Sequence, residues 1–284
     1  MENKIKISAK IVYYVILVIV AVITLTPILY TICGAFKTNS EILANPENMF
    51  PKEPTFDNFI TAWNSKNFNV KTMTWNSIYY TLISVAITIL TSSMGGYVFA
   101  RGDFYGKKVI FAILTSLMFI SLGGITIYPT FEVLNLLGLS QSIWGLLVMK
   151  VFGIGIVQIY LVRSHILTLP KSIEEAAEID GCGFIGIYFR VIMPLLKPIL
   201  ATIGILAFQG SWNEYLMPTI FTMSRPEQRT LIVGVMALKN SEEAASSWNL
   251  MLAGATISLI PVLFAYAVGN KYFVSGLASG AVKG

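Results

Sequence analysis

Long uncharged apolar runs alternate with short polar blocks along the chain. A helix that crosses a bilayer needs about 20 mostly apolar residues, because each residue rises about 1.5 Å through a hydrocarbon core about 30 Å thick. The segments that meet or approach this length are about residues 11–33, 78–100, 109–131, 143–162, 198–221 and 250–268. The pattern predicts an all-α polytopic membrane protein, with six transmembrane helices in a single domain over residues 1–284.

Two of these segments contain a charge. Lys150 stands near the middle of the fourth, and Glu214 lies within the fifth, where we expect it near the water interface. A charge inside a span is costly unless it is paired or faces water. Lys150 could therefore line a solute pathway, pair with a carboxylate of a partner subunit, or extend its ammonium group to an interface. Trp212 is either an interfacial anchor or, with Glu214, part of an outer gate.

The composition excludes other classes of protein. Hydrophobic residues make up 55% of the chain and charged residues 12%, whereas about 25% of residues are charged in soluble domains. The net charge of +5 is explained by basic residues that orient membrane spans. We therefore expect the chain to lie in a lipid bilayer and to bind no nucleic acid. Residues 102–108 hold two glycines with three residues between them rather than four, and no Ser or Thr, so they do not form a phosphate-binding loop. We predict no catalytic site, cofactor or metal in this chain.

The distribution of Lys and Arg predicts the orientation, because cytoplasmic loops retain a positive excess. With the N-terminus inside, the inner segments hold twelve basic residues and the outer segments seven, over longer stretches. Both termini are therefore expected in the cytoplasm. The inner residues are Lys4, Lys6, Lys10, Arg101, Lys107, Lys108, Arg163, Lys171, Arg190, Lys197, Lys271 and Lys283; the outer ones are Lys37, Lys52, Lys66, Lys71, Arg225, Arg229 and Lys239.

The inner loop between the fourth and fifth spans, about residues 170–194, is patterned as a helix and turn. Ser172 followed three residues later by Glu175 predicts a capping box that begins a short helix. Gly181 can adopt the left-handed conformation that ends it. A second short helix is expected at residues 184–191, before Pro194 opens the fifth span. Without further information, an amphipathic helix at the membrane interface explains this loop equally well.

The spacing within the loop carries a resemblance. The loop resembles the EAA loop of permease subunits in binding-protein-dependent ABC importers. The resemblance lies in Glu175-Ala176-Ala177, followed after three residues by Gly181 and after nine more by residues 191–194 (Val-Ile-Met-Pro). Val191 and Met193 depart from the usual I-x-L-P ending by apolar replacements. Residues 179–181 (Ile-Asp-Gly), 210–215 and the tail 273–284 are similar to the carbohydrate-uptake branch, specifically the six-span permease of the maltose-transporter type.

This resemblance implies a permease subunit of an ATP-driven importer that moves a sugar or oligosaccharide into the cytoplasm. The implied location is the plasma (inner) cell membrane. The implied partners are a second permease subunit in a heterodimer, two cytoplasmic ABC ATPase subunits that bind ATP and Mg, and an extracytoplasmic solute-binding protein. The residues implied to couple to the ATPase are Glu175, Ala176, Ala177, Asp180, Gly181 and Pro194.

Two other functions are alternatives to the sugar permease. A permease of the same superfamily could carry a peptide or a polyamine, and only family likeness distinguishes these solutes. An ion- or proton-coupled secondary carrier would show paired repeats, broken helices and intramembrane acids. The first four expected spans contain no carboxylate, which disfavours a carrier.

Overall fold

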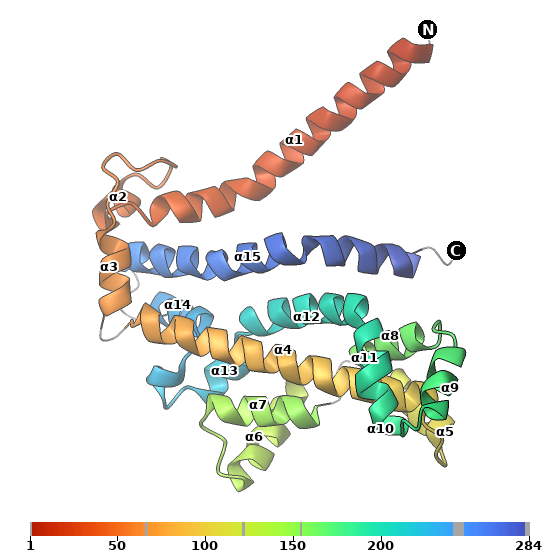
Figure 1. Cartoon of the computed structure of the whole chain (residues 1–284). Coiled ribbons are helices and arrows are strands. Elements are labelled where there is room, and N and C mark those ends of the chain that lie inside the picture. The colour runs from red at the N-terminus through yellow and green to blue at the C-terminus, as the bar shows by residue number, and fades with distance from the viewer. Residues whose placement is uncertain (1, 66–67, 121–122, 154, 241–246, 282–284) are drawn as a thin grey trace. The chain divides into compact units, whose positions relative to one another are not determined.

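The computed structural model describes residues 2–65, 68–120, 123–153, 155–240 and 247–281. Within these ranges the chain forms helices joined by turns and loops, with no β-strand (Figure 1). The helices divide into two units with their own internal contacts, Met1–Lys71 with Gly234–Ile260, and Thr72–Val233 with Pro261–Gly284. Met1 and Gly284, whose cytoplasmic location the sequence predicts, lie outside the described residues.

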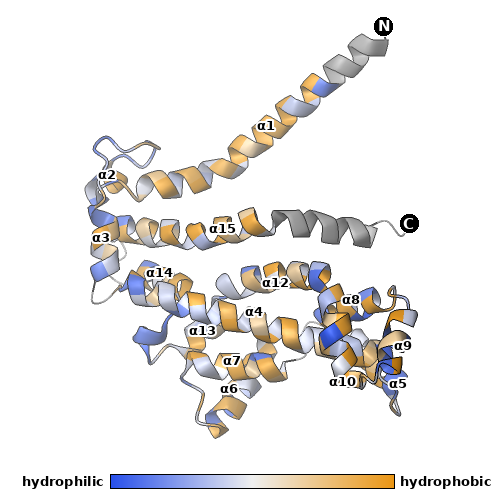
Figure 2. Cartoon of the chain, in the orientation of Figure 1, coloured by the Kyte–Doolittle hydropathy of each residue, from blue (hydrophilic) through white to orange (hydrophobic). Residues whose placement is uncertain are grey.

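The first unit contains α1 (Glu2–Gly34), α2 (Asn39–Ala44), α3 (Asp57–Asn64) and the first part of α15 (Trp248–Ala281). Along α1 the residues from Lys10 to Leu29 are all exposed, and most of them are apolar (Figure 2). A helix that is apolar all round and exposed requires an apolar environment. This helix therefore has the surface of a membrane-spanning segment.

The polar segment after α1 folds against its own neighbours. The rings of Phe36, Phe56 and Phe59 lie 5.1–6.3 Å apart between centroids. The buried Asn58 amide donates to the carbonyls of Ala35 and Lys37 at 2.8 and 2.7 Å. Its oxygen accepts a bond of 2.7 Å from Asn249 at the start of α15. The turns are thus held by satisfied buried polar groups.

The long helix α4 (Val70–Arg101) organises the second unit. Two clusters of buried residues form along it. One, around Tyr97, includes residues of α8 (Ile156–Ile166), α9 (Ser172–Ile179) and α12 (Lys197–Trp212). The other, around Tyr80, includes residues of α6 (Ile127–Leu136), α7 (Ile143–Phe152) and α13 (Leu216–Phe221). The two clusters therefore lie towards opposite ends of α4.

The expected spans 109–131 and 143–162 are each broken into two helices. α5 (Lys107–Ser116) and η1 (Leu117–Phe119) meet η2 (Gly123–Thr126) and α6 at 114°. α7 and α8 meet at 41°. Glycines stand at both breaks, Gly123 and Gly124 at the first, and Gly153 and Gly155 at the second. Because glycine is a poor helix former, these positions interrupt helices that hydropathy alone would continue.

The expected fifth span also differs in its limits. α10 (Phe184–Ile187), the π-helical turn η3 (Tyr188–Ile192) and α11 (Met193–Leu195) form one helical stretch, which meets α12 at 78°. Pro194 lies before this bend, so the apolar segment is opened by Lys197, with Pro198 in its first turn as proline geometry favours. α13 is separated from α12 by residues 213–215 and does not continue it.

The remaining helices are η4 (Pro226–Gln228) and α14 (Leu231–Lys239), which the sequence did not predict. In the described part of the chain, three helices are long and apolar enough to cross a membrane, and up to six segments if each bent pair is one span. The chain is an all-helical membrane protein.

Candidate functional site

The helix of the residue 170–194 loop is present as α9, but it begins differently from the prediction. The expected capping box of Ser172 and Glu175 is wrong: the N-cap residue is Lys171, which makes no side-chain capping bond. The Lys171 carbonyl instead accepts from the amides of Glu174 and Glu175 at 2.9 and 3.0 Å. Lys171 is already in the α region, with φ −64° and ψ −28°, so Ser172 lies inside the first turn.

The end of α9 follows the prediction. Gly181 has φ +81°, in the left-handed region. Its amide donates to the Glu178 carbonyl, and the Cys182 amide donates to the Ala177 carbonyl, both at 2.9 Å. This pair of bonds is a Schellman motif, which turns the chain sharply after the helix.

One face of α9 is fastened to the rest of the second unit. Arg101, the last residue of α4, donates through Nε to Glu174 Oε1 at 2.6 Å, and through Nη2 to the carbonyls of Ile166 and Leu169 at 3.1 Å. The side chains of Arg101 and Glu174 are only 10% and 11% exposed. Arg101 therefore ties α4, the end of α8 and α9 together.

Ala177 lies on this same inward face and is buried in the cluster around Tyr97. Residues 174 and 177 share a face because they are three apart on a helix. Of the residues implied to contact the ATPase, Ala177 therefore faces its own chain. The exposed ones are Glu175, Ala176, Asp180, Gly181 and Pro194.

The stretch after α9 is also held by α4. The Tyr97 ring lies 4.5 Å from that of Phe184, and its hydroxyl donates to the Phe184 carbonyl at 3.2 Å. The hydroxyls of Ser93 and Tyr188 are 2.7 Å apart. Figure 1 shows α8, α9, α10 and α11 gathered about the C-terminal end of α4. The loop is thus packed against that end of α4.

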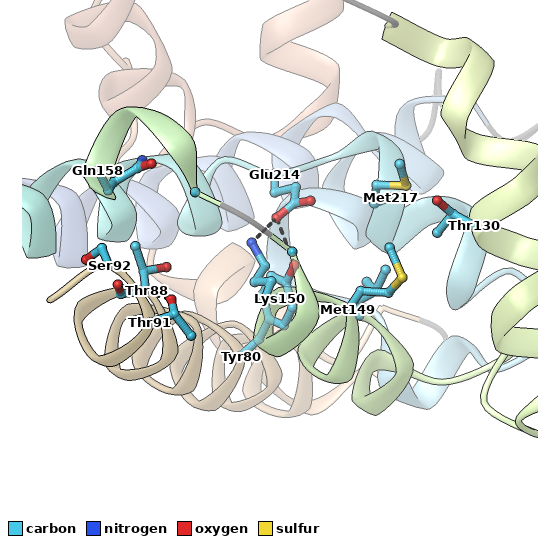
Figure 3. Close-up of a pocket in the computed structure, with 13 residues that line it drawn as sticks. Tyr80, Thr88, Thr91, Ser92, Thr130, Met149, Lys150, Gln158, Glu214 and Met217 are labelled. Atoms are coloured by element: carbon cyan, nitrogen blue, oxygen red, sulfur yellow. Dashed lines mark hydrogen bonds and ion pairs between the residues drawn. The ribbon is translucent and has the colours of Figure 1, made fainter. Parts of the chain in front are cut away.

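Lys150 occupies a second polar site, at the other cluster. Its ammonium Nζ lies 2.9 Å from Glu214 Oε2, 3.3 Å from Ser211 Oγ and 5.3 Å from the centroid of the Tyr80 ring. The Tyr80 hydroxyl donates to the same Glu214 oxygen at 2.8 Å. Figure 3 shows Lys150, Glu214 and Tyr80 converging at the edge of a pocket. Lys150 thus has a carboxylate partner within its own chain.

Sequence reasoning named Lys150 and Glu214 separately and missed their pairing, as well as Arg101, Glu174 and Tyr80. Trp212 is buried, and its ring stacks on Phe208 at 5.8 Å between centroids, so it does not line this pocket. The described residues include no group of three side chains placed to hold a metal ion.

Comparison with known proteins decides the family. Residues 96–278 match the family described as "Binding-protein-dependent transport system inner membrane component". The chain belongs to this family. It is a membrane permease subunit of an ABC importer and not an enzyme, and the secondary-carrier alternative is wrong.

The relatives cover nearly the whole chain. It is 32% identical over 262 residues to the arabinooligosaccharides transport system permease protein of Bacillus subtilis (strain 168), covering 92% of this chain and 91% of that one. It is 32% identical over 262 residues to the sulfoquinovosyl glycerol transport system permease protein of Agrobacterium fabrum, covering 92% and 89%. A chain of a solved bacterial ABC transporter, involved in import of the acidic polysaccharide alginate, matches with a TM-score of 0.79 and 28% identity, covering 93% of this chain and 96% of that one.

Proposed function

We propose that this permease moves a sugar or oligosaccharide inward and that α9 couples it to an ATPase subunit. The observation that carries the proposal is the division of α9 into two faces. Glu174 and Ala177 are buried and fastened to α4 and α8, whereas Glu175, Ala176 and Ile179 are exposed, the last by 88%. A movement of the ATPase subunit against the exposed face of α9 would therefore move α4 and α8 with it, as a rigid-body mechanism of coupling requires.

The substrate class rests on the relatives and on the pocket. The relatives' names specify an arabinooligosaccharide, a sulfoquinovosyl glycerol and alginate, which are all carbohydrates. A polyamine would need uncompensated carboxylates, but in the described structure the acid that lines the pocket, Glu214, is paired with Lys150. These facts favour a sugar over the peptide or polyamine alternative.

The number of spans, their orientation and the partner subunits are part of the same proposal. The broken segments 107–136, 143–166 and 184–212 each count as one span, which gives six with α1, α4 and α15. The residue 170–194 loop faces the cytoplasm, with both termini on that side. The partners are a second permease subunit, two ATPase subunits that bind ATP and Mg, and an extracytoplasmic solute-binding protein.

The test places a bulky residue on each of two exposed surfaces. In Ala176→Trp the added ring would hold the ATPase surface away from α9, since packed interfaces tolerate little added volume. Leu136→Trp is the matched control, because Leu136 is 86% exposed at the end of α6, in the other part of the unit. We expect co-purification of the ATPase subunits and ATP-coupled sugar uptake to fall only in Ala176→Trp. Full retention of both in that variant would remove α9 as the coupling element.

A further inference from the structure

A cavity of about 350 Å³ opens beside the Lys150–Glu214 pair, entirely within the second unit (Figure 3). Its volume lies near the lower end of the range of about 300–1,000 Å³ typical of small-molecule pockets. In Figure 3 the polar side chains of Thr88, Thr91, Ser92 and Gln158 stand on one side of the ion pair, and Met149 and Met217 on the other. Thr130 also lies on the side of the methionines, so the cavity has a hydrogen-bonding side and a mainly apolar side that carries one hydroxyl.

The polar side offers both donors and acceptors. The hydroxyls of Thr88 and Thr91 donate to the carbonyls of Ser84 and Ile87 at 2.8 Å, which leaves their oxygen lone pairs free to accept. The Gln158 amide has two N–H donors and a carbonyl oxygen, and no partner for it is found within the described part of the chain. Such a mixture complements hydroxyl groups, which donate and accept at once.

The apolar side complements the carbon faces of a sugar ring. Met149 and Met217 supply flexible, polarizable side chains that adapt to an irregular surface. The glycines at the α7–α8 break, Gly153 and Gly155, also line the cavity and bring backbone close to it. Helix breaks beside a polar cavity are a recurring way of presenting backbone groups to a solute in membrane transporters.

The charges of the cavity cancel. Lys150 and Glu214 are the charged residues of its lining in the described structure, and they are paired at 2.9 Å with 27% of each side chain exposed. An acidic solute would find the ammonium already occupied and a carboxylate beside it, which disfavours its binding. A neutral solute incurs no such penalty.

We propose that this cavity contacts the solute in transit and selects a neutral, polyhydroxylated ring over an acidic one. This rests on the proposed function as a sugar permease and specifies the class of sugar.

The contact is tested in the complete transporter, with its solute-binding protein, by uptake of neutral trisaccharides (arabinotriose, galactotriose and maltotriose) and of trigalacturonate. Gln158→Leu and Thr130→Val each remove a polar group of the lining. Gln141→Leu and Thr115→Val are matched changes outside it. We expect the first pair to lower neutral uptake about two- to tenfold, the effect of losing one neutral hydrogen bond, and the second pair to leave it unchanged. Equal uptake in all four variants would overturn the contact.

The charge argument is tested by Glu214→Gln, which frees the Lys150 ammonium but keeps an acceptor for Tyr80. We expect the ratio of acidic to neutral uptake to rise at least several-fold over wild type, with the same solute-binding protein in every assay. In the double variant Lys150→Met, Glu214→Gln the ratio should return to the wild-type value, because the cavity is again uncharged. An unchanged ratio in Glu214→Gln would contradict the selectivity.

The two proposals fail differently. A wild-type transporter that moves none of these sugars would remove the sugar function and this inference together. A wild-type transporter that moves a sugar while the cavity variants behave as their controls would remove only this inference. Preference of the wild type for trigalacturonate would leave the sugar function intact and contradict a neutral cavity.

Discussion

At the residue scale, the buried pair of Arg101 and Glu174 fastens α9, the proposed coupling helix, to the end of α4. A salt bridge on a protein surface contributes little, but removal of one partner from a buried pair strands a charge and costs about 3–5 kcal/mol. Arg101 also satisfies two carbonyls, of Ile166 and Leu169. Its loss would therefore remove the donor from the Glu174 carboxylate and the Leu169 carbonyl, whereas the Ile166 carbonyl would still accept from the Leu169 amide at 3.0 Å.

Arg101→Met should accordingly lower the melting temperature of the purified subunit and uncouple ATP hydrolysis from uptake. The double variant Arg101→Met, Glu174→Met should recover part of the stability, because it leaves no buried charge. Recovery of stability without recovery of coupling would separate the positioning of α9 from folding. Wild-type stability in the single variant would show that the pair carries none of this constraint.

Two neighbouring glycines isolate the effect of the backbone at the end of α9. A side chain at Gly181 or at Gly183 would meet nothing within 4 Å, but φ is +81° at Gly181 and −77° at Gly183. Gly181→Val should cost on the order of 1–2 kcal/mol or redirect the chain, because a branched residue resists the left-handed region. Gly183→Val should have a much smaller effect. Both variants are assayed by co-purification of the ATPase subunits and by ATP-coupled uptake. If Gly181→Val and Gly183→Val gave the same values, the turn at residue 181 would tolerate another backbone conformation.

At the element scale, α4 and α8 approach closely at Gly96. A methyl group there would lie 2.5 Å from Val162 Cγ1 and 3.0 Å from the backbone nitrogen of Arg163. Small residues at such crossings let membrane helices pack closely. Gly96→Ala should therefore destabilise the subunit by about 1–3 kcal/mol, as overpacking does. Gly210→Ala, where nothing lies within 4 Å, is the control for the loss of a glycine. If Gly96→Ala and Gly210→Ala had the same melting temperature in detergent, the close crossing of α4 and α8 would be contradicted.

The helices also show what the sequence could and could not specify. Every expected apolar segment is helical over much of its length, because hydropathy acts locally, and the turn at Gly181 follows from a local preference for glycine. The breaks at Gly153 and before Pro198 depend on packing around them, so hydropathy merges or misplaces those helices. The partner of Lys150 is 64 positions away, at Glu214. Only the arrangement of α7 against the α12–α13 break brings them together, which no local pattern encodes.

At the scale of the whole molecule, α4 is long enough to hold two different polar loops at its two ends. Its 32 residues rise about 48 Å, more than the hydrocarbon core of about 30 Å. At its C-terminal end Arg101 holds α9, and at its N-terminal end the Asn76 amide donates to the carbonyls of Glu227 and Arg229 at 2.8 and 2.9 Å. The loop that carries Glu227 therefore lies at the opposite end of α4 from α9.

Cysteine labelling tests which end faces the cytoplasm. In a background with Cys33 and Cys182 replaced by Ser, a membrane-impermeant maleimide applied to intact cells should label Cys at Asn64 or Glu227 and not at Asp103. All three positions are exposed in the subunit, so differences in labelling report the side of the membrane. Asp103→Cys should react only after permeabilisation, because it follows the end of α4 that holds α9, the proposed coupling helix. Labelling of Asp103→Cys in intact cells, with Glu227→Cys protected, would reverse the orientation and put α9 out of reach of a cytoplasmic ATPase.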